Sequence, residues 1–497
     1  METTPSVISQ EANTPCVETA SRDKSLLHGI AWTGAVQWSS QIISWLSTIT
    51  VARLLSPEDY GLVAMAAVVM GLINLCNEAV YMGVVSVRSL TVNQIPYTHG
   101  FAILIGMAGF IVSLLVAIPM GHFYRASEVP LIMITMGAGY AVGTIRAIPV
   151  AILNKELRFK FLAFLDGGMA IVTTLMTLGL ALWGAGYWAL VVGVLMGSLS
   201  ATAVVSVYRP IRPLWPTWES VRELIKLSSH ILGNRLSWYV ASQSSLFITG
   251  RILGHAALGV YSFAVDIANV QLDKVTSLAS KLMPAIYSSV RSDPPALRRY
   301  FLLLTEGVSI ITFPSGVGLS LIARDGVALI FGEKWLAIVG PLQILACWAS
   351  LRSVAGLLDP ILYVTGGSHK MMFNGIYCAI TFPLTFWVAS RFGIVGIAAA
   401  WVVVQPPSWV IPYRHVLRAT GLALPDYVRA LWPALSSTLL MGAGILGMQQ
   451  VIPHDWPLTF RLIVEFLGGA SMYVASMLGF HRGRVRLLFE WIRSSGA

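Results

Sequence analysis

The chain has 497 residues, of which 56% are hydrophobic and 11% charged, and its formal net charge is +10 at pH 7. An average soluble domain carries about 25% charged residues, so this composition excludes an ordinary soluble enzyme and indicates a protein surrounded mainly by lipid. A nucleic-acid-binding protein gathers its basic residues on one solvated face. Here they lie in alternate loops between apolar stretches, so we expect no nucleic-acid partner.

Fourteen apolar stretches follow one another along the chain. A helix needs about 20 apolar residues to cross the hydrocarbon core, and the stretches lack the short alternating pattern of a transmembrane barrel. The sequence therefore predicts an all-α polytopic membrane protein with about 14 transmembrane helices. The predicted helices are 25–53, 60–86, 97–121, 129–153, 162–183, 187–208, 227–251, 256–289, 299–322, 338–362, 371–390, 394–416, 427–451 and 458–480.

The segments outside these helices indicate the orientation of the chain. Residues 1–24 are rich in Ser, Thr and Glu and lack the pattern of a signal peptide, so we expect a disordered cytoplasmic tail there. Residues 209–226 begin Pro-rich and end as a short amphipathic helix, typical of a linker on the inner membrane surface. Residues 481–497 form a basic tail. Lys and Arg are concentrated in the loops on one side, which predicts that both termini are cytoplasmic.

The two parts of the chain on either side of the linker resemble each other. Arg53 and Gly61 follow the first predicted helix, and Arg251 and Gly259 follow the seventh with the same spacing. Six helices per copy give both copies the same orientation in the membrane, so this is a parallel repeat. The predicted organisation is an N-lobe over 25–208, a C-lobe over 227–416 and two further helices over 427–480.

The run from Ala52 to Ala64, ARLLSPEDYGLVA, resembles the signature after the first helix of bacterial polysaccharide-export flippases. The segment from Gly250 to Ser262 resembles its second-lobe counterpart. The resemblance indicates the polysaccharide transporter family of the multidrug/oligosaccharidyl-lipid/polysaccharide exporter superfamily, similar to flippases of the colanic acid or O-antigen type. Relatives often have Asp where this chain has Ser245, and Arg where it has Asp266, which puts ion coupling through that Asp in doubt.

The resemblance implies a V-shaped pair of lobes, alternating access, and a cationic cavity for an undecaprenyl-pyrophosphate-linked oligosaccharide repeat unit. It places the protein in the bacterial inner membrane, in exopolysaccharide, capsule or O-antigen biosynthesis. The expected partners are the lipid-linked oligosaccharide, the bilayer, an H⁺ or Na⁺ counter-ion, and a polysaccharide polymerase with glycosyltransferases. No cofactor is expected.

Charged residues inside a bilayer are costly and are expected to face a cavity or a partner. Since guanidinium groups bind phosphate oxygens bidentately and Lys acts as a point charge, we predict that the basic residues within the helices bind the head group. The alternative is that each pairs with an acid, as Asp273 does with Lys281 or Asp359 with Arg352. The head-group candidates are Arg235, Lys274, Lys281, Arg146 and Arg352.

Polar side chains recur on single faces of three predicted helices, which indicates a shared cavity. The predicted cavity-lining residues are Gln37, Gln41, Ser44, Asn234, Ser242 and Gln243, and the ion-coupling candidates are Asp266 and Asp273. Trp238 and Tyr239 are candidates for stacking on sugars.

Other charged residues have different interpretations. We expect Arg53, at a helix end, to contact a helix C-terminal dipole or a loop. Glu78, Glu306 and Glu465 are interpreted as isolated acids at helix interfaces.

Other functions remain open from the residues alone. A cation-coupled drug exporter or a peptidoglycan-precursor exporter of the same superfamily shares these features, although fourteen helices favour a lipid substrate. A membrane polysaccharide polymerase or transferase needs a sizeable loop or domain for its catalytic groups, and the predicted outer joints are short. The sequence also has no GxxxxGK[ST], HExxH or GxSxG motif, so we expect no enzyme activity and no metal site.

Overall fold

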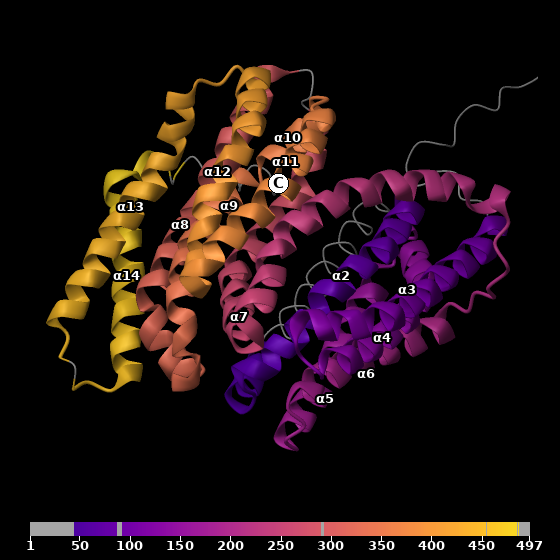
Figure 1. Cartoon of the computed structure of the whole chain (residues 1–497). Coiled ribbons are helices and arrows are strands. Elements are labelled where there is room, and N and C mark those ends of the chain that lie inside the picture. The colour runs from indigo at the N-terminus through magenta and orange to yellow at the C-terminus, as the bar shows by residue number, and fades with distance from the viewer. Residues whose placement is uncertain (1–43, 87–91, 290–292, 454, 485, 487–497) are drawn as a thin grey trace, which may run out of the picture.

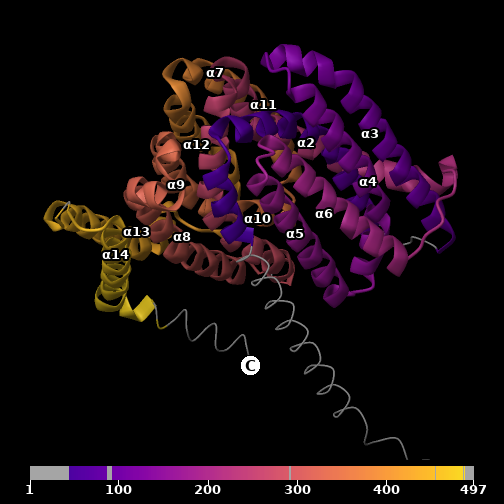
Figure 2. The same cartoon turned by 90° about the horizontal axis from the view of Figure 1, so that it is seen from below.

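The computed structural model describes residues 44–86, 92–289, 293–453, 455–484 and 486, and for parts of α7 and α11 it describes the backbone alone. All regular elements in these ranges are helices. They form two bundles side by side, with α13 and α14 along the outer flank of the second bundle (Figure 1). Seen from below, α13 and α14 lie beside α8 and far from α2–α6 (Figure 2).

The first bundle contains α2 (Pro57–Ser86), α3 (Ile95–Tyr124), α4 (Val129–Lys155), α5 (Phe159–Leu182) and α6 (Tyr187–Tyr208), with the short η1 (Val92–Gln94) before α3. The second contains α7 (Trp218–Ser289), α8 (Pro294–Ile330), η2 (Glu333–Ile338), α9 (Val339–Ala355), α10 (Leu358–Val364), α11 (Ser368–Ala389), η3 (Ser390–Phe392) and α12 (Gly393–Thr420). It is followed by α13 (Leu424–Val451) and α14 (Leu458–Phe480).

The predicted all-α polytopic membrane fold is confirmed. In the described part of the chain, 11 helical segments are long and apolar enough to cross a membrane, and one of them, Lys370–Thr420, contains both α11 and α12. Within the described residues the helices follow the predicted order with three differences, and the predicted tail 1–24 and most of the predicted helix 25–53 lie outside these residues. The predicted helices 227–251 and 256–289 both lie within α7, with a break in the helical backbone at Gly254. The predicted surface helix of the linker is continuous with α7, which begins at Trp218, and the predicted helix 338–362 is divided into α9 and α10.

Local sequence explains where two helices begin and where one breaks. Before α2, the Ser56 amide donates to Asp59 Oδ2 at 2.9 Å and the Asp59 amide donates to Ser56 Oγ at 3.2 Å, so the two residues cap the helix reciprocally. Asp293 caps α8 by accepting a hydrogen bond from the amide of Ala296 at 3.1 Å. The long α7 is interrupted at Gly254, whose φ of 87° suits a residue without Cβ.

The two lobes meet along α2 and α7 through glycines that are equivalent in the repeat. A Cβ on Gly61 would lie 1.8 Å from the carbonyl oxygen of His255, and a Cβ on Gly259 would lie 1.7 Å from that of Pro57. Each glycine therefore lets the backbone of the other lobe approach to contact distance, as small residues do between membrane helices. The contact is reciprocal, as expected for two copies related by a local two-fold axis.

Arg53 and Arg251, which the sequence comparison pairs, each contact the other lobe, but by different interactions. Arg53 Nε donates to the carbonyl oxygen of Ile330 at 2.7 Å, and its Nη2 donates to that of Leu329, both at the end of α8. Arg251 lies over the ring of Phe123, near the end of α3, at 5.1 Å. As predicted, Arg53 contacts the C-terminal end of a helix, but that helix is α8 of the other lobe.

Two residues of η2 complete this contact from the C-lobe side. Lys334 Nζ donates to the carbonyl oxygens of Arg53 at 2.7 Å and Leu55 at 2.6 Å, and the fully buried Trp335 donates through Nε1 to that of Ala52 at 2.8 Å. These carbonyl groups lie at the C-terminal end of the helix over 44–54, where the helix itself supplies no amide donors for them. We call the contact formed by residues 52–61, 255–259 and 329–335 the closed seam.

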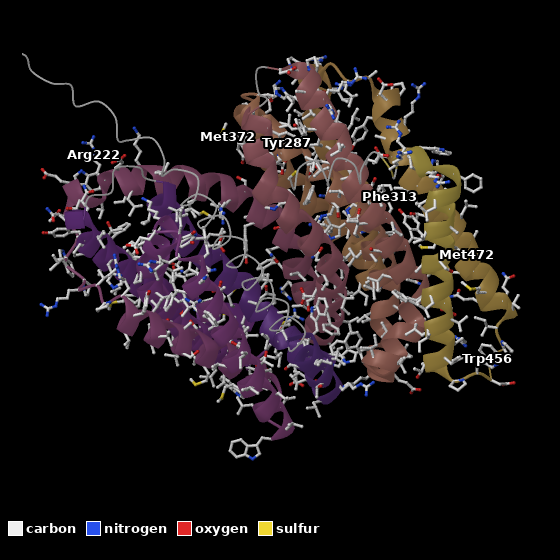
Figure 3. All side chains as sticks on the ribbon, turned by 180° about the vertical axis from the view of Figure 1, so that it is seen from behind. Arg222, Tyr287, Phe313, Met372, Trp456 and Met472 are labelled. Atoms are coloured by element: carbon white, nitrogen blue, oxygen red, sulfur yellow. The ribbon has the colours of Figure 1, made fainter. Side chains whose placement is uncertain are left out.

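Two residues mark opposite ends of the molecule. Arg222 lies near the start of α7, and Trp456 lies between α13 and α14 at the other end (Figure 3).

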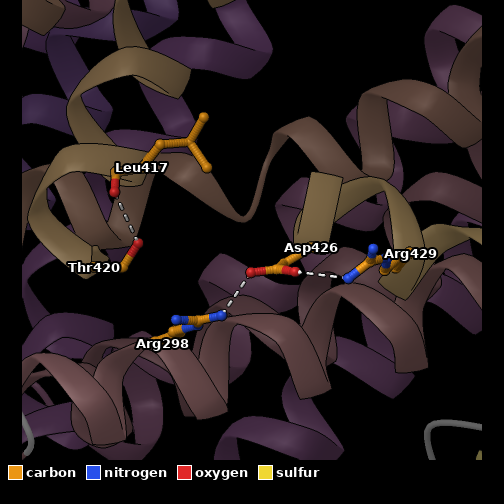
Figure 4. Close-up of polar contacts among 5 residues, drawn as sticks. All are labelled: Arg298, Leu417, Thr420, Asp426 and Arg429. Atoms are coloured by element: carbon orange, nitrogen blue, oxygen red, sulfur yellow. Dashed lines mark hydrogen bonds and ion pairs between the residues drawn. The ribbon is translucent and has the colours of Figure 1, made fainter. Parts of the chain in front are cut away.

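Asp426, near the start of α13, forms two ion pairs. Arg298 of α8 donates to Asp426 Oδ2 at 2.8 Å, and Arg429 of α13 lies 3.3 Å from Asp426 Oδ1 (Figure 4). The Arg298–Asp426 pair ties the start of α13 to α8, and the Arg429–Asp426 pair lies within α13.

Candidate functional site

A cavity of about 650 Å³ lies between the two lobes. Its walls come from α2, α7, α9, α10, α11 and α12, and three of these helices present residues at i, i+3, i+4 and i+7 spacing, which is one helical face. On α2 the face contains Gly71, Asn74 and Glu78, and on α7 it contains Arg235 and Ser242. At 1.5 Å per residue, Gly71 is about 20 Å along α2 from Pro57, so the cavity lies well away from the closed seam.

Arg235 is the best-placed head-group candidate, and it already has a partner. It forms an ion pair with Glu78, so that α7 and α2 are joined across the cavity. Both side chains are partly exposed, at 38% for Arg235 and 46% for Glu78, so the pair is open to solvent and to a ligand. An exposed pair is worth about 0–1 kcal/mol, which an incoming anion can replace.

The interpretation of three acids as isolated is wrong. Glu78 pairs with Arg235, and one Glu306 oxygen lies 3.9 Å from Arg484. Glu465 Oε2 accepts a hydrogen bond from Gln449 at 3.3 Å. These partners are distant in sequence or lie on other helices, which the spacing of charges along one helix does not reveal.

Arg352 lies in the same cavity as Arg235. Its guanidinium is 5.7 Å from the ring centroid of Trp401, within the range of a cation–π contact. Asp359, in the first turn of the neighbouring α10, also lines the cavity. The structure thus places Arg235 and Arg352 in one cavity, with Glu78 paired to Arg235 and Asp359 elsewhere on the wall.

Arg146 lies in a second cavity, of about 540 Å³, inside the N-lobe. Its Nη1 lies 3.0 Å from the sulfur of Met169, and Asp166 is its acidic neighbour on α5. The second cavity shares Gly71, Asn74 and Glu78 with the inter-lobe cavity, so α2 forms the wall between them. The structure therefore separates Arg146 from Arg235 and Arg352.

The remaining predicted residues are placed as follows. Ser242 lines the inter-lobe cavity, and Gln243 is half-buried on α7. The carbonyl of Ser44 accepts a hydrogen bond from Thr48 at 2.8 Å. Asp266 is exposed on α7 and lies near Tyr60 of α2. Outside the described part of the chain lie Gln37 and Gln41 and the side chains of Asn234, Asp273, Lys274 and Lys281.

Sequence reasoning missed several residues of the cavity wall and of the closed seam. Tyr363 and Asn374 line the cavity from α10 and α11, and Lys334 and Trp335 bind the opposite lobe. None of these four is a charged residue within a predicted helix, and such residues were the basis of the predicted head-group site. A polar or aromatic residue on one helix gives no sign of which distant helix faces it.

The two bundles of membrane-spanning helices around a polar cavity define a multi-pass membrane transporter of the two-lobe class. Residues 50–340 match the model of the family described as polysaccharide biosynthesis protein. The chain belongs to this family. The resemblance predicted from the Ala52–Ala64 run is thereby confirmed.

Curated relatives and solved structures agree with this assignment. The chain is 21% identical to the lipopolysaccharide biosynthesis protein WzxC of Escherichia coli (strain K12), over 77% of this chain and 79% of that one. It is 20% identical to the succinoglycan biosynthesis transport protein ExoT of Rhizobium meliloti (strain 1021), over 95% and 96%.

The fold is similar to that of the lipid II flippase MurJ in an inward closed conformation, with a TM-score of 0.71, 12% identity, and coverage of 92% of this chain and 100% of that one. An inward-facing multidrug resistance MATE transporter gives a TM-score of 0.63 at 13% identity, with coverage of 76% and 96%. At these identities the likeness concerns the fold.

Proposed function

We propose that this protein carries an undecaprenyl-pyrophosphate-linked oligosaccharide from the inner to the outer leaflet of the bacterial inner membrane, for the synthesis of a surface polysaccharide. The observation that carries the proposal is the inter-lobe cavity, in which Arg235 and Arg352 lie within the membrane-spanning part of a polysaccharide biosynthesis family fold. The names of WzxC and ExoT support a role in polysaccharide biosynthesis and transport.

The proposed mechanism begins with an exchange of partners at Arg235. A pyrophosphate diester has two negative charges, and its oxygens form charge-assisted hydrogen bonds with guanidinium groups. When the head group binds Arg235, Glu78 loses its partner, and a tie between α2 and α7 is broken. Substrate binding thus weakens the lobe contact at the cavity, which favours a rearrangement of the lobes.

Completion of the cycle requires the closed seam to open. The hydrogen bonds from Arg53, Lys334 and Trp335 hold the lobes together at the end remote from the cavity. In an alternating-access cycle this end separates while the lobes meet around Arg235. Outward movement of two negative charges is favoured by about 2.3 kcal/mol per charge per 100 mV of inside-negative potential, so the potential supports the direction of transport.

The proposal includes an orientation with both termini cytoplasmic. Reporter fusions should then give a cytoplasmic signal at residue 215, in the linker, and a periplasmic signal at residue 330, in the closed seam. A reversed signal at either site contradicts this orientation.

A deletion strain tests the function directly. We expect it to accumulate the polyprenyl-diphosphate oligosaccharide in the inner membrane, detected by mass spectrometry of extracted lipids, and to lose the polymer from its surface. The strain complemented with the intact chain should restore both. Accumulation of a peptidoglycan precursor in place of the polymer repeat unit would assign the protein to a different lipid substrate.

A further inference from the structure

Four aromatic side chains line the inter-lobe cavity: Trp238 and Tyr239 from α7, Tyr363 from α10 and Trp409 from α12. The Tyr239 hydroxyl donates to the carbonyl oxygen of Val68 on α2 at 2.6 Å, so the other three are the candidates for contact with a ligand. Trp238 of α7 and Tyr363 of α10 are 47% and 53% exposed, and Trp409 of α12 is half-buried. Trp409 stacks on Trp348 with ring centroids 5.1 Å apart and an interplanar angle of 9°, and Trp348 Nε1 donates to Gln405 Oε1 at 2.8 Å. Trp409 is thus held in place by a stacked ring that a buried hydrogen bond fixes, and the more exposed rings of Trp238 and Tyr363 line the same cavity.

The same part of the cavity contains an unsatisfied acceptor. Asn374 Oδ1 is buried and accepts no hydrogen bond from the described residues. A buried polar atom without a partner is unfavourable, and a ligand hydroxyl that reaches Asn374 would supply the missing donor. Asn374 lines the cavity from α11, which packs against α7, the helix that provides Trp238.

The charges on this cavity wall do not favour an anion alone. Arg235 is paired with Glu78, and the second guanidinium, that of Arg352, shares the wall with Asp359. Two cations and two acids give no formal excess charge among these four side chains. A ligand for this region therefore needs hydroxyl groups for the carboxylates and amides and apolar faces for the rings.

Saccharides combine these properties, because a pyranose ring presents C–H groups on its faces and hydroxyl groups around its edge. We propose that Trp238, Tyr363, Trp409 and Asn374 form a saccharide subsite within the inter-lobe cavity, which binds the sugars adjacent to the head group. The subsite rests on the proposed function, and it specifies which part of the substrate the protein recognises, namely the sugars next to the head group. A cavity of about 650 Å³ is of the size that holds a small-molecule ligand, so a longer repeat unit extends beyond it.

The test compares two lipids on the full-length protein in nanodiscs. One is undecaprenyl pyrophosphate without sugar, and the other is the oligosaccharide-bearing lipid extracted from the deletion strain. The measured quantity is the ratio of the two dissociation constants. The intact protein should bind the sugar-bearing lipid more tightly. Trp238→Leu and Asn374→Leu should each lower this preference about tenfold, the equivalent of one lost hydrogen bond or ring contact, and leave the affinity for the sugar-free lipid within about threefold.

Two further variants separate the ring from the fold. Trp238→Phe keeps an aromatic face and should retain most of the preference. Trp432→Leu removes a tryptophan that is 54% exposed on α13, away from the cavity lining, and should change nothing. An unchanged preference in both Trp238→Leu and Asn374→Leu, or an equal loss of affinity for both lipids, overturns the subsite.

The outcomes for the intact protein separate this inference from the proposed function. Equal affinity for the two lipids overturns the saccharide subsite while the flippase proposal stands. Binding of neither lipid contradicts the proposed function, and the subsite fails with it.

Discussion

The closed seam leads to a quantitative prediction for Lys334→Met. This change removes the hydrogen bonds from Lys334 Nζ to the carbonyl oxygens of Arg53 and Leu55. Because Lys334 is exposed, we take the ordinary net value of about 0.5–1 kcal/mol per hydrogen bond. The loss of both bonds destabilises the closed seam by about 1–2 kcal/mol, a factor of about 5–30 in the population of the open arrangement.

Cysteine labelling measures this population. Leu258 is fully buried beside the Gly61–Gly259 contact, so a cysteine there reacts with a membrane-impermeant maleimide only when the seam opens. The reporter is Leu258→Cys in a background with the four native cysteines replaced. The labelling rate should rise about 5- to 30-fold when Lys334→Met is added.

The matched control is Arg324→Met, on α8, the helix that precedes η2. Arg324 is also exposed, and it has no hydrogen bond or ion pair in the part of the chain that the structure describes. Its removal should leave the labelling rate unchanged. An unchanged rate in Lys334→Met at normal protein abundance, or an equal rise in both variants, would refute the role of the seam.

Three further predictions concern other contacts between helices. Because the Arg235–Glu78 pair is partly exposed, Arg235→Met and the Glu78→Gln/Arg235→Met double variant should both keep near-normal membrane abundance, measured by immunoblot. Both should lose polymer export, and export from either variant would remove Arg235 from the head-group site. Arg146→Met should lower membrane abundance because Asp166 loses its cationic neighbour. The double variant Arg146→Met/Asp166→Asn should restore the abundance, and its polymer export then shows whether the N-lobe cavity takes part in transport. Gly259→Ala places a methyl group against the facing backbone and should raise the Leu258→Cys labelling rate; a normal rate contradicts the close approach.

The succession of helices could be predicted from the sequence because each apolar run is long enough to span the bilayer. The differences arise where local signals are weak. The linker helix and helix 7 join through Lys226 and Leu227 without a glycine or proline to separate them. The division between α9 and α10 falls at Gly356 and Leu357, so Gly356 and the nearby Pro360 were the local break signals, and the apolar run around them concealed the division.

The site was less predictable because its contacts join residues that are far apart in the chain. Arg235 and Glu78 are separated by 157 positions, and no helical spacing relates them. The polar character of both was evident, but their partnership was not. The sequence comparison paired Gly61 with Gly259 by spacing alone, and it gave no sign that each lies against the backbone beside the other.

Transport of the sugar-bearing lipid across a reconstituted bilayer tests the central claim most directly. Proteoliposomes would contain the purified protein and the oligosaccharide-bearing undecaprenyl pyrophosphate, and a membrane-impermeant glycosidase or lectin would report the fraction of sugar exposed outside over time. The account predicts rapid exposure with the intact chain, and slow exposure with Arg235→Met and with liposomes lacking protein. Equal rates for the intact chain and for liposomes without protein, in vesicles where the protein is folded and the lipid is bound, would contradict it.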